Sequence, residues 1–303
     1  MIGIIFNPAA RGEKAVRFRE HLADLGPDVR VVPTRHAGDA RVLAQTLVAD
    51  GHDCLVAAGG DGTVNEVLNG LCDHPDGLSR TRLGVIPLGT VNVLARELGV
   101  PAGFRGAWAW IRSGAHRLVD LPCAEFSSAE GARERRHFIL LAGAGLDSQA
   151  IGLVNWQLKK RLGPMAYVWA GVRAMRLPHR PLVAGAHTVE MAAIGNGRFY
   201  GGCFPLFPGA CLDDGLLDFT LVPRVTWPVI LRVFLHLLGD RVAGSRDVVR
   251  LRGPMLTLES AAPVPLQLDG DLVGWLPATI TVRARALKLA APAVADRPEA
   301  GAT

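Results

Sequence analysis

Cysteine is scarce in the chain, and no pattern joins the cysteines that are present. Five occur among 303 residues, and no pair has the C-x-x-C spacing of a metal knuckle or a redox motif. Zinc sites and disulfide frameworks need cysteines at regular spacing, so we expect neither. The pattern instead indicates reduced thiols in a cytoplasmic protein. These cysteines are Cys54, Cys72, Cys123, Cys203 and Cys211.

Long apolar runs are also missing. The most apolar later stretch, residues 225–238, is too short to span a bilayer and contains Pro228, Arg232 and His236. We expect a buried or interfacial helix there, and at most peripheral association with a membrane. The chain opens directly on the apolar residues 2–6, without a basic segment before them, so we expect no signal peptide.

Strong charge of either sign is absent as well. The net charge is +5, which is too weak to indicate a nucleic-acid partner. It fits nucleotide phosphates, an anionic membrane surface or an ordinary basic surface equally well. Hydrophobic residues make up 49% of the chain and charged residues 20%, which is enough apolar material for a large core. A length of 303 residues fits two domains.

The stretch 54–65 carries the clearest chemical signal. An apolar run, Leu55–Ala58, predicts a buried strand, and Thr63 opens a helical pattern. Between them stand Gly59, Gly60 and Gly62, which we expect to let the backbone turn tightly and approach a ligand. A strand, a glycine-rich turn and a helix N-terminus together favour phosphate binding. The spacing is neither that of a Walker A loop nor that of the dinucleotide fingerprint.

Strands and helices alternate through the first part of the chain, which predicts a doubly wound parallel sheet over residues 1–117. In such a sheet, ligands bind beyond the carboxyl ends of the strands. The turns expected there contain Asn7, Thr34, residues 59–65 and residues 89–92. The expected strands are 2–6, 29–33, 55–58 and 82–87, and the expected helices are 14–25, 39–49, 63–71, 93–98 and 103–113.

The pattern changes near residue 118, where β-rich segments separated by turns begin. They predict an antiparallel β-sandwich domain over residues 118–290, whose last strand could return to the first domain. Residues 127–135 are polar and are expected to form a hairpin loop, and residues 291–303 a disordered tail. The expected strands are 118–126, 136–141, 183–194, 217–222, 248–252, 255–258, 264–268 and 280–289, and the expected helices are 149–176 and 227–238.

Several motifs resemble those of the diacylglycerol-kinase catalytic domain superfamily, which includes bacterial lipid kinases and sphingosine kinases. Gly59-Gly60-Asp61-Gly62-Thr63 is similar to its glycine-rich signature, which NAD kinases and phosphofructokinases share in related form. The block from Pro87 to Asn92, followed by Leu94-Ala95-Arg96, is more specific to the lipid kinases. Val93 departs from the pattern, because many bacterial members have Asp there. Further similar blocks are 143–147, 163–167, 195–202, 208–210, 213–218 and 267–271.

The resemblance implies a phosphofructokinase- and NAD-kinase-like first domain and an ATP-dependent lipid kinase with Mg²⁺ as cofactor. The lipid head group would lie between the domains, at the membrane surface, and a homodimer is compatible with this function. Which lipid is phosphorylated is not encoded in the residue types. The residues implied for ATP binding are Asn7, Thr34, Gly59, Gly60, Asp61, Gly62, Thr63, Val64, Asn65, Gly89, Thr90 and Asn92.

Four acidic positions carry the implied chemistry. In the family, an Asp at the place of Asp269 is the general base for the lipid hydroxyl, and Asp271 could share its site. Asp214, with the carbonyls of Cys211 and Leu216, matches a loop that holds a structural cation in some members. Asp61 would be a ligand of the nucleotide magnesium, directly or through water, or a helix N-cap.

Simpler structural roles stay open for several of these motifs. Asp269-Gly270 is also typical of a simple hairpin turn, and Asp213-Asp214-Gly215 of a turn without metal. The basic residues 159–161 could form a solvated helix face or a membrane contact. For the whole protein, the alternatives are a NAD kinase and a non-catalytic lipid- or nucleotide-binding module on the same fold.

Overall fold

The computed structural model describes residues 1–10, 13–101, 103–128, 130–153, 165–202, 204–238 and 247–291. Two compact units are present, and each is built from separate parts of the chain. Unit 1 contains Met1–Gly89, Leu98–Val119 and Ala286–Thr303, and unit 2 contains Thr90–Glu97 and Asp120–Arg285. Cys203, residues 159–161 and residues 292–303, on which some of our predictions fall, lie outside the described residues.

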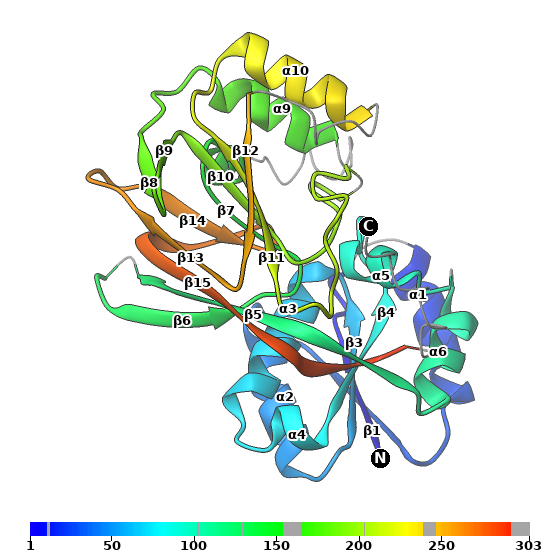
Figure 1. The fold of residues 1–303 in the computed structure, drawn as a ribbon. Helices are drawn as coiled ribbons and strands as arrows, with labels where there is room; N and C mark the ends of the chain where they lie inside the picture. The colour runs from blue at the N-terminus through cyan, green and yellow to red at the C-terminus, as the bar shows by residue number, and fades with distance from the viewer. Residues whose placement is uncertain are drawn as a thin grey trace, which may run out of the picture. The chain divides into compact units, whose positions relative to one another are not determined.

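Unit 1 contains a parallel sheet with helices on both faces (Figure 1). The strand order is β4-β3-β1-β2, and the end of β15 adds to β4 in parallel through Leu289 and Leu83. Every residue of β1 and β3 is buried, as expected for strands covered on both faces. The elements are β1 (Ile2–Phe6), α1 (Glu13–Glu20), η1 (His21–Asp24), β2 (Val29–Pro33), α2 (Asp39–Ala49), β3 (Cys54–Gly59), α3 (Asp61–Asp73), α4 (Gly77–Arg80), β4 (Arg82–Pro87) and α6 (Phe104–Arg112).

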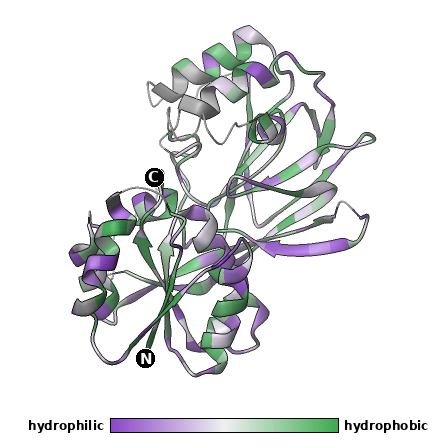
Figure 2. Ribbon diagram, turned by 180° about the vertical axis from the view of Figure 1, so that it is seen from behind, coloured by the Kyte–Doolittle hydropathy of each residue, from purple (hydrophilic) through white to green (hydrophobic). Residues whose placement is uncertain are grey.

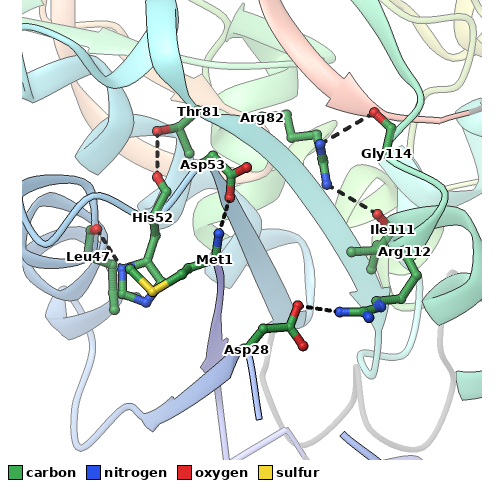
Figure 3. Close-up of polar contacts among 10 residues, drawn as sticks. All are labelled: Met1, Asp28, Leu47, His52, Asp53, Thr81, Arg82, Ile111, Arg112 and Gly114. Carbon is green, nitrogen blue, oxygen red and sulfur yellow. Dashed lines mark hydrogen bonds and ion pairs between the residues drawn. The ribbon is translucent and has the colours of Figure 1, made fainter. Parts of the chain in front are cut away.

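Side-chain bonds tie together the amino ends of these strands (Figure 3). The Met1 ammonium group lies 2.6 Å from Asp53 Oδ1, and Thr81 Oγ1 donates to the His52 carbonyl at 3.1 Å. Arg112 contacts Asp28 at 2.5 Å, and this hydrogen bond lowers the pKa of Asp28 below its ordinary value. This end of the sheet is therefore closed by polar contacts, and the opposite end carries the glycine-rich turn.

Unit 2 is an antiparallel sheet system with strand order β12-β11-β10-β7-β14-β15, to which β13, β5, β6, β8 and β9 add at the sides. One apolar cluster of its core includes Phe138, Ile194, Phe219 and Leu266, and another includes Ala174, Met175, Val222 and Val225. The elements are α5 (Val93–Leu98), β5 (His116–Ser127), β6 (Arg133–His137), β7 (Leu141–Gly145), α7 (Leu146–Leu153), α9 (Met165–Ala174), β8 (Leu182–Ala184), β9 (His187–Val189), β10 (Met191–Gly195), β11 (Leu217–Val222), α10 (Trp227–Leu238), β12 (Val249–Gly253), β13 (Met255–Glu259), β14 (Pro265–Leu268) and β15 (Asp271–Ala290).

The fold class expected from the sequence is confirmed, but several boundaries differ. The single strand expected over 136–141 is wrong, because β6 ends at His137 and β7 begins at Leu141. Between them, backbone N–H groups bind a side chain instead of a neighbouring strand. The loop expected over 127–135 is shorter, since Arg133 already pairs with Ser127. The strand expected over 183–194 is three strands, and the helix expected from Thr63 begins at Asp61.

Candidate active site

The turn from β3 to α3 presents backbone donors at the carboxyl edge of the unit 1 sheet. Gly60 is the N-cap of α3, and its carbonyl accepts the first helical bond from the Val64 N–H at 3.1 Å. The N–H groups of a helix's first turn have no acceptor within the helix, and the helix dipole adds positive potential there. The turn is thus arranged as an anion site, and a phosphate is the ligand that such a site fits.

The glycines of this turn provide space and not an unusual backbone conformation. None of Gly59, Gly60 and Gly62 has a positive φ, although only Gly60 separates the end of β3 from the start of α3. A Cβ on Gly59 would lie 2.4 Å from Thr63 Oγ1, which makes this glycine a packing requirement. A Cβ on Gly60 would meet only Gly89 Cα at 3.5 Å, and one on Gly62 would meet nothing within 4 Å. These two positions therefore keep the surface of the turn open.

Three other predicted residues lie at the same edge. The Asn7 N–H donates to the Ala58 carbonyl at 2.9 Å, and Asn7 Nδ2 donates to Thr63 Oγ1 at 3.1 Å. The Thr34 N–H donates to the Phe6 carbonyl at 2.8 Å. The Gly89 N–H donates to the Gly59 carbonyl at 3.2 Å. The structure thus brings the ends of β1, β3 and β4 and the residue after β2 around the start of α3.

Two of the predicted ATP-binding residues, Val64 and Asn65, are buried on α3. Val64 is 4% exposed and Asn65 is 2% exposed. Asn69 Nδ2 donates to both the carbonyl and the Oδ1 of Asn65, at 2.9 and 3.1 Å. The Val64 N–H is used within the helix, so the ligand-facing part of the motif narrows to residues 60–63.

Thr90 and Asn92 belong to unit 2, with the start of α5. Asn92 has φ +53°, a left-handed conformation that asparagine tolerates, and its carbonyl accepts from the Arg96 N–H at 3.1 Å. Arg96 in turn donates to the Gly202 carbonyl at 2.8 Å. The Glu97 carboxylate, 5% exposed, accepts from the Arg198 side chain at 2.8 Å and from its N–H at 3.0 Å. Helix α5, which follows the Pro87–Asn92 block, is therefore anchored on residues 195–202.

Asp269 and Gly270 form the two-residue turn between β14 and β15. Their φ values are +48° and +92°, and Leu268 pairs with Asp271 across the turn. Positive φ at both central residues is the type I′ pattern that Asp-Gly favours. The dipeptide is therefore a hairpin turn and can hold a functional carboxylate at the same time. Asp271 lies on the exposed start of β15.

The carboxylate of Asp269 is held by three consecutive backbone N–H groups. Ile139 donates to Oδ2 at 2.9 Å, and Leu140 and Leu141 donate to Oδ1 at 2.9 and 3.0 Å. The Asp269 N–H donates back to the Leu141 carbonyl at 2.7 Å. Hydrogen bonds from N–H groups to a charged acceptor are stronger than those between neutral groups, so both oxygens are fixed in place. This use of the N–H groups is why β6 and β7 are separate strands.

A buried chain of polar side chains supports the same turn. Gln267, fully buried, accepts from the Gly270 N–H at 2.9 Å and donates to Asp147 Oδ2 at 2.8 Å. The Tyr200 hydroxyl donates to Asp147 Oδ1. Burial raises the pKa of Asp147 above its ordinary value. Gly143 leaves room for this carboxyl, because a Cβ there would lie 1.6 Å from Asp147 Oδ2.

Sequence reasoning did not single out this chain of contacts. Asp147 and Tyr200 stand inside two blocks that carry the family resemblance, 143–147 and 195–202, and Gln267 precedes Asp269 by two residues. Only alternation along β14 gave a signal, since Leu266 and Leu268 are core residues. A strand residue between them faces the other side of the sheet, and Gln267 is nevertheless fully buried.

The predicted cation loop contains an ion pair. Asp214 Oδ2 lies 2.5 Å from Arg252, and Asp214 Oδ1 accepts from the Leu216 N–H at 3.0 Å. Cys211 Sγ lies 3.0 Å from Asp213 Oδ1. Arg252 thus supplies positive charge where a cation was expected. In the part of the chain that the structure describes, no three His, Cys, Asp or Glu side chains gather in a way that could hold a metal ion.

Comparison with known proteins assigns both halves of the chain. Residues 1–124 match the diacylglycerol kinase catalytic domain, and residues 141–291 match the YegS C-terminal NAD kinase beta sandwich-like domain. A protein of Xanthomonas campestris named "Probable lipid kinase YegS-like" is 35% identical over 256 residues, which cover 80% of each chain. The chain belongs to the diacylglycerol kinase family of lipid kinases.

Other members of this kinase family are similar over almost the whole chain. A protein of Staphylococcus aureus named "Diacylglycerol kinase" is 29% identical over 304 residues, covering 95% of this chain and 91% of that protein. The crystal structure of a diacylglycerol kinase from Bacillus anthracis has a TM-score of 0.71 at 22% identity, over 96% of this chain and 97% of that one. The structural likeness shows the fold. The resemblance drawn from the motifs is confirmed.

Proposed function

We propose that the protein is an ATP-dependent kinase that transfers the γ-phosphate to a hydroxyl group of a membrane lipid similar to diacylglycerol. Family membership supports a lipid kinase, and the names of the relatives support the class of substrate. The observation that carries the proposal is the Asp269 carboxylate, which three backbone N–H groups hold at a two-residue turn.

A fixed carboxylate suits phosphoryl transfer to an alcohol. The transition state is loose in most analyses, so catalysis depends mainly on positioning and on stabilising charge. In the proposed step, the Asp269 carboxylate accepts the proton of the lipid hydroxyl while that oxygen forms its bond to the γ-phosphorus. The bond from this phosphorus to the β,γ-bridging oxygen breaks, and the electron pair leaves with ADP. Orientation of the acceptor hydroxyl is therefore the main task assigned to Asp269.

The nucleotide phosphates are assigned to residues 60–63, whose first-turn N–H groups and positive helix end attract anions. Missing Cβ atoms at Gly60 and Gly62 let the phosphates approach the backbone. The half-buried Asp61 fits Mg²⁺, because it places a carboxylate, the kind of oxygen ligand this ion prefers, at the same edge. When bound, Mg²⁺ would neutralise phosphate charge.

The experiment is a transfer assay with γ-labelled ATP and Mg²⁺. The purified protein is incubated in parallel with diacylglycerol, phosphatidylglycerol, a sphingoid base, a polyprenol and NAD, and label is followed into each acceptor. We expect label in a lipid alcohol and none in NAD. Label only in NAD would replace the proposal by a nucleotide kinase. Binding of ATP without transfer to any acceptor would indicate a non-catalytic module.

A further inference from the structure

Six large apolar side chains are exposed along two helices of unit 2 and the residues just after one of them. We call them the α9–α10 surface. Trp227, Leu231 and Leu235 on α10 are exposed by 51%, 58% and 56%. The set consists of Trp169, Val172, Leu177, Trp227, Leu231 and Leu235.

Helix α10 is apolar on two faces. One face, with Val229 and Ile230, packs on a cluster that includes Val222 and Val225. The exposed residues follow one another at intervals of four, which places them in a single outward stripe. A surface helix of a globular protein normally carries polar residues on its outer face. The apolar stripe therefore indicates that something apolar covers it in the working protein.

Helix α9 extends the same surface. Ala174 and Met175, at its end, pack in the cluster that holds α10, so both helices lie on one support. Figures 1 and 2 show the two helices side by side from opposite sides, and Figure 2 shows both as largely hydrophobic. The outward residues of α9 and its end, Trp169, Val172, Arg173 and Arg176, follow helical spacing.

The charges around this surface are positive. Residues 165–182 and 223–238 contain no Asp or Glu. Their arginines are Arg173, Arg176, Arg180, Arg224 and Arg232. The Arg173 guanidinium lies over the Trp169 ring, 4.9 Å from its centroid.

Among the residues that the structure describes, two acids contact this surface or its support from other segments. Arg232 is paired with Asp247 at 2.6 Å, and Glu190 accepts from the Val225 N–H at 2.6 Å. The excess of arginine over carboxylate persists after these contacts are included.

We infer that the α9–α10 surface docks on an anionic lipid bilayer. Tryptophan and leucine beside arginine are the composition of helices that lie in a membrane interface. A second copy of this chain would bring arginine against arginine, so the charge favours the bilayer. No helix among the described residues is long and apolar enough to cross a membrane. Docking would give the enzyme access to a substrate held in the bilayer, and this purpose rests on the proposed function.

The test is flotation of the full-length protein with vesicles of phosphatidylcholine, with and without phosphatidylglycerol. The variant is the double substitution Leu231→Asp with Leu235→Asp, and the control is Val42→Asp, an equally exposed apolar residue on α2 of unit 1. We expect the double variant to bind anionic vesicles at least about tenfold more weakly, and the control to bind like the wild type. A circular-dichroism melt checks that both variants are folded.

A second pair of variants tests the charge. Arg173→Gln with Arg176→Gln should weaken binding to anionic vesicles about fivefold per arginine and reduce its dependence on salt. Arg283→Gln, at an exposed arginine on β15, is the control. Full vesicle binding by folded variants of both kinds overturns the inference. The inference is also overturned if light scattering shows that the wild type is a dimer and the leucine variant a monomer, while the leucine variant still binds vesicles.

Failure of the docking surface and failure of the proposed function give different results. With a water-soluble short-chain diacylglycerol, the leucine variant should retain wild-type turnover, because neither residue belongs to the proposed active site. With the same lipid in anionic vesicles, its turnover should fall with its binding. Absence of transfer to any lipid by the wild type would remove the proposed function, and the flotation result would still decide the docking surface.

Discussion

The two candidate sites, one in each unit, are built in opposite ways. In unit 1, the anion site at the start of α3 consists of consecutive residues, and the donors assigned to it are first-turn backbone N–H groups beside glycines that leave space for a ligand. In unit 2, the donors are again backbone N–H groups, but they hold a side chain, and Asp269 lies about 130 positions along the chain from Ile139–Leu141. The first part is suited to receive an anion from outside, and the second already contains one.

This contrast predicts different responses to substitution. A change in the glycine turn should affect ligand affinity with little effect on folding, wherever the added atoms meet open space. A change at Asp269 or behind it should affect the position of the carboxylate, and with it turnover and stability.

The largest expected effect is that of Asp269→Asn. Asparagine keeps the size and accepts the left-handed φ of +48°, but it cannot take up the proton of the acceptor hydroxyl. Its amide would also face a backbone N–H donor of residues 139–141, which weakens the hold on the side chain. Turnover should fall about 10²–10⁴-fold, while ATP affinity stays near that of the wild type. Lipid phosphorylation and ATP titration by calorimetry measure the two quantities.

The matched control is Asp271→Asn, at the exposed start of β15 two residues further on. Near-normal turnover in the Asp269 variant would remove this residue from the chemistry. Equal losses in both variants would make Asp271 a partner in the site. Loss of ATP binding in the Asp269 variant would instead assign it to the nucleotide or metal site.

The next effect concerns Asp147, behind the Asp269 turn. An Asn at this position can accept from Gln267 through its oxygen, but its amide then faces the Tyr200 hydroxyl, which loses the bond that it donates, so Asp147→Asn should cost about 1 kcal/mol of unfolding free energy. If the amide of Gln267 reorients, it loses its bond to the Gly270 N–H, and the turn that positions Asp269 is loosened. We then expect a fall in kcat that is larger than any change in KM. A readout in kcat separates this positioning role from a purely structural one.

The same variant has a predicted pH signature. Burial raises the pKa of Asp147, so the folded protein still holds this proton where the unfolded chain, with a pKa of about 3.9, has lost it. The folded state binds more protons in that window, and the free energy of unfolding contributed by Asp147 falls as pH rises through it. Asp147→Asn should lack this decline. Parallel wild-type and variant curves in denaturant melts from about pH 4 upward would contradict the prediction.

In unit 1, we expect Gly60→Ala to weaken ATP binding about tenfold, which corresponds to about 1.4 kcal/mol, without a change in Tm. Its Cβ would enter the space assigned to phosphate and would meet only Gly89 Cα. Gly59→Ala is the contrast, because its Cβ would collide with Thr63 and should lower Tm. Unchanged nucleotide affinity in a folded Gly60 variant, measured by calorimetry, would show that phosphate does not approach this turn.

The smallest effect is expected at Asp214. Its pair with Arg252 is partly exposed, so Asp214→Ala should cost at most about 1 kcal/mol. If Arg252 supplies the positive charge, thermal stability should not respond to a chelator. A Tm that falls with EDTA, and no longer does so in Asp214→Ala, would restore the structural cation predicted from the sequence.

How much the sequence could predict follows from how local each feature is. The glycine turn, the strands of unit 1 and the Asp-Gly turn depend on neighbouring residues, and their patterns were readable. The division between β6 and β7 was not, because it depends on a carboxylate far along the chain that takes the N–H groups of 139–141. The Asp147–Gln267 contact likewise joins the start of α7 to β14, and no local sequence period connects these two segments.

The division of the chain between the units has a consequence for fragments. The chain passes from one unit to the other four times, and the end of β15 pairs with β4 although the residues before it belong to unit 2. A gene truncated after residue 117 would encode β4 without this neighbour, and an unpaired edge strand promotes aggregation. A protease cut in any one loop would leave the pieces associated. We therefore expect the two family domains to fold only when they are expressed together. A recombinant that carries the first domain without β15 should not fold.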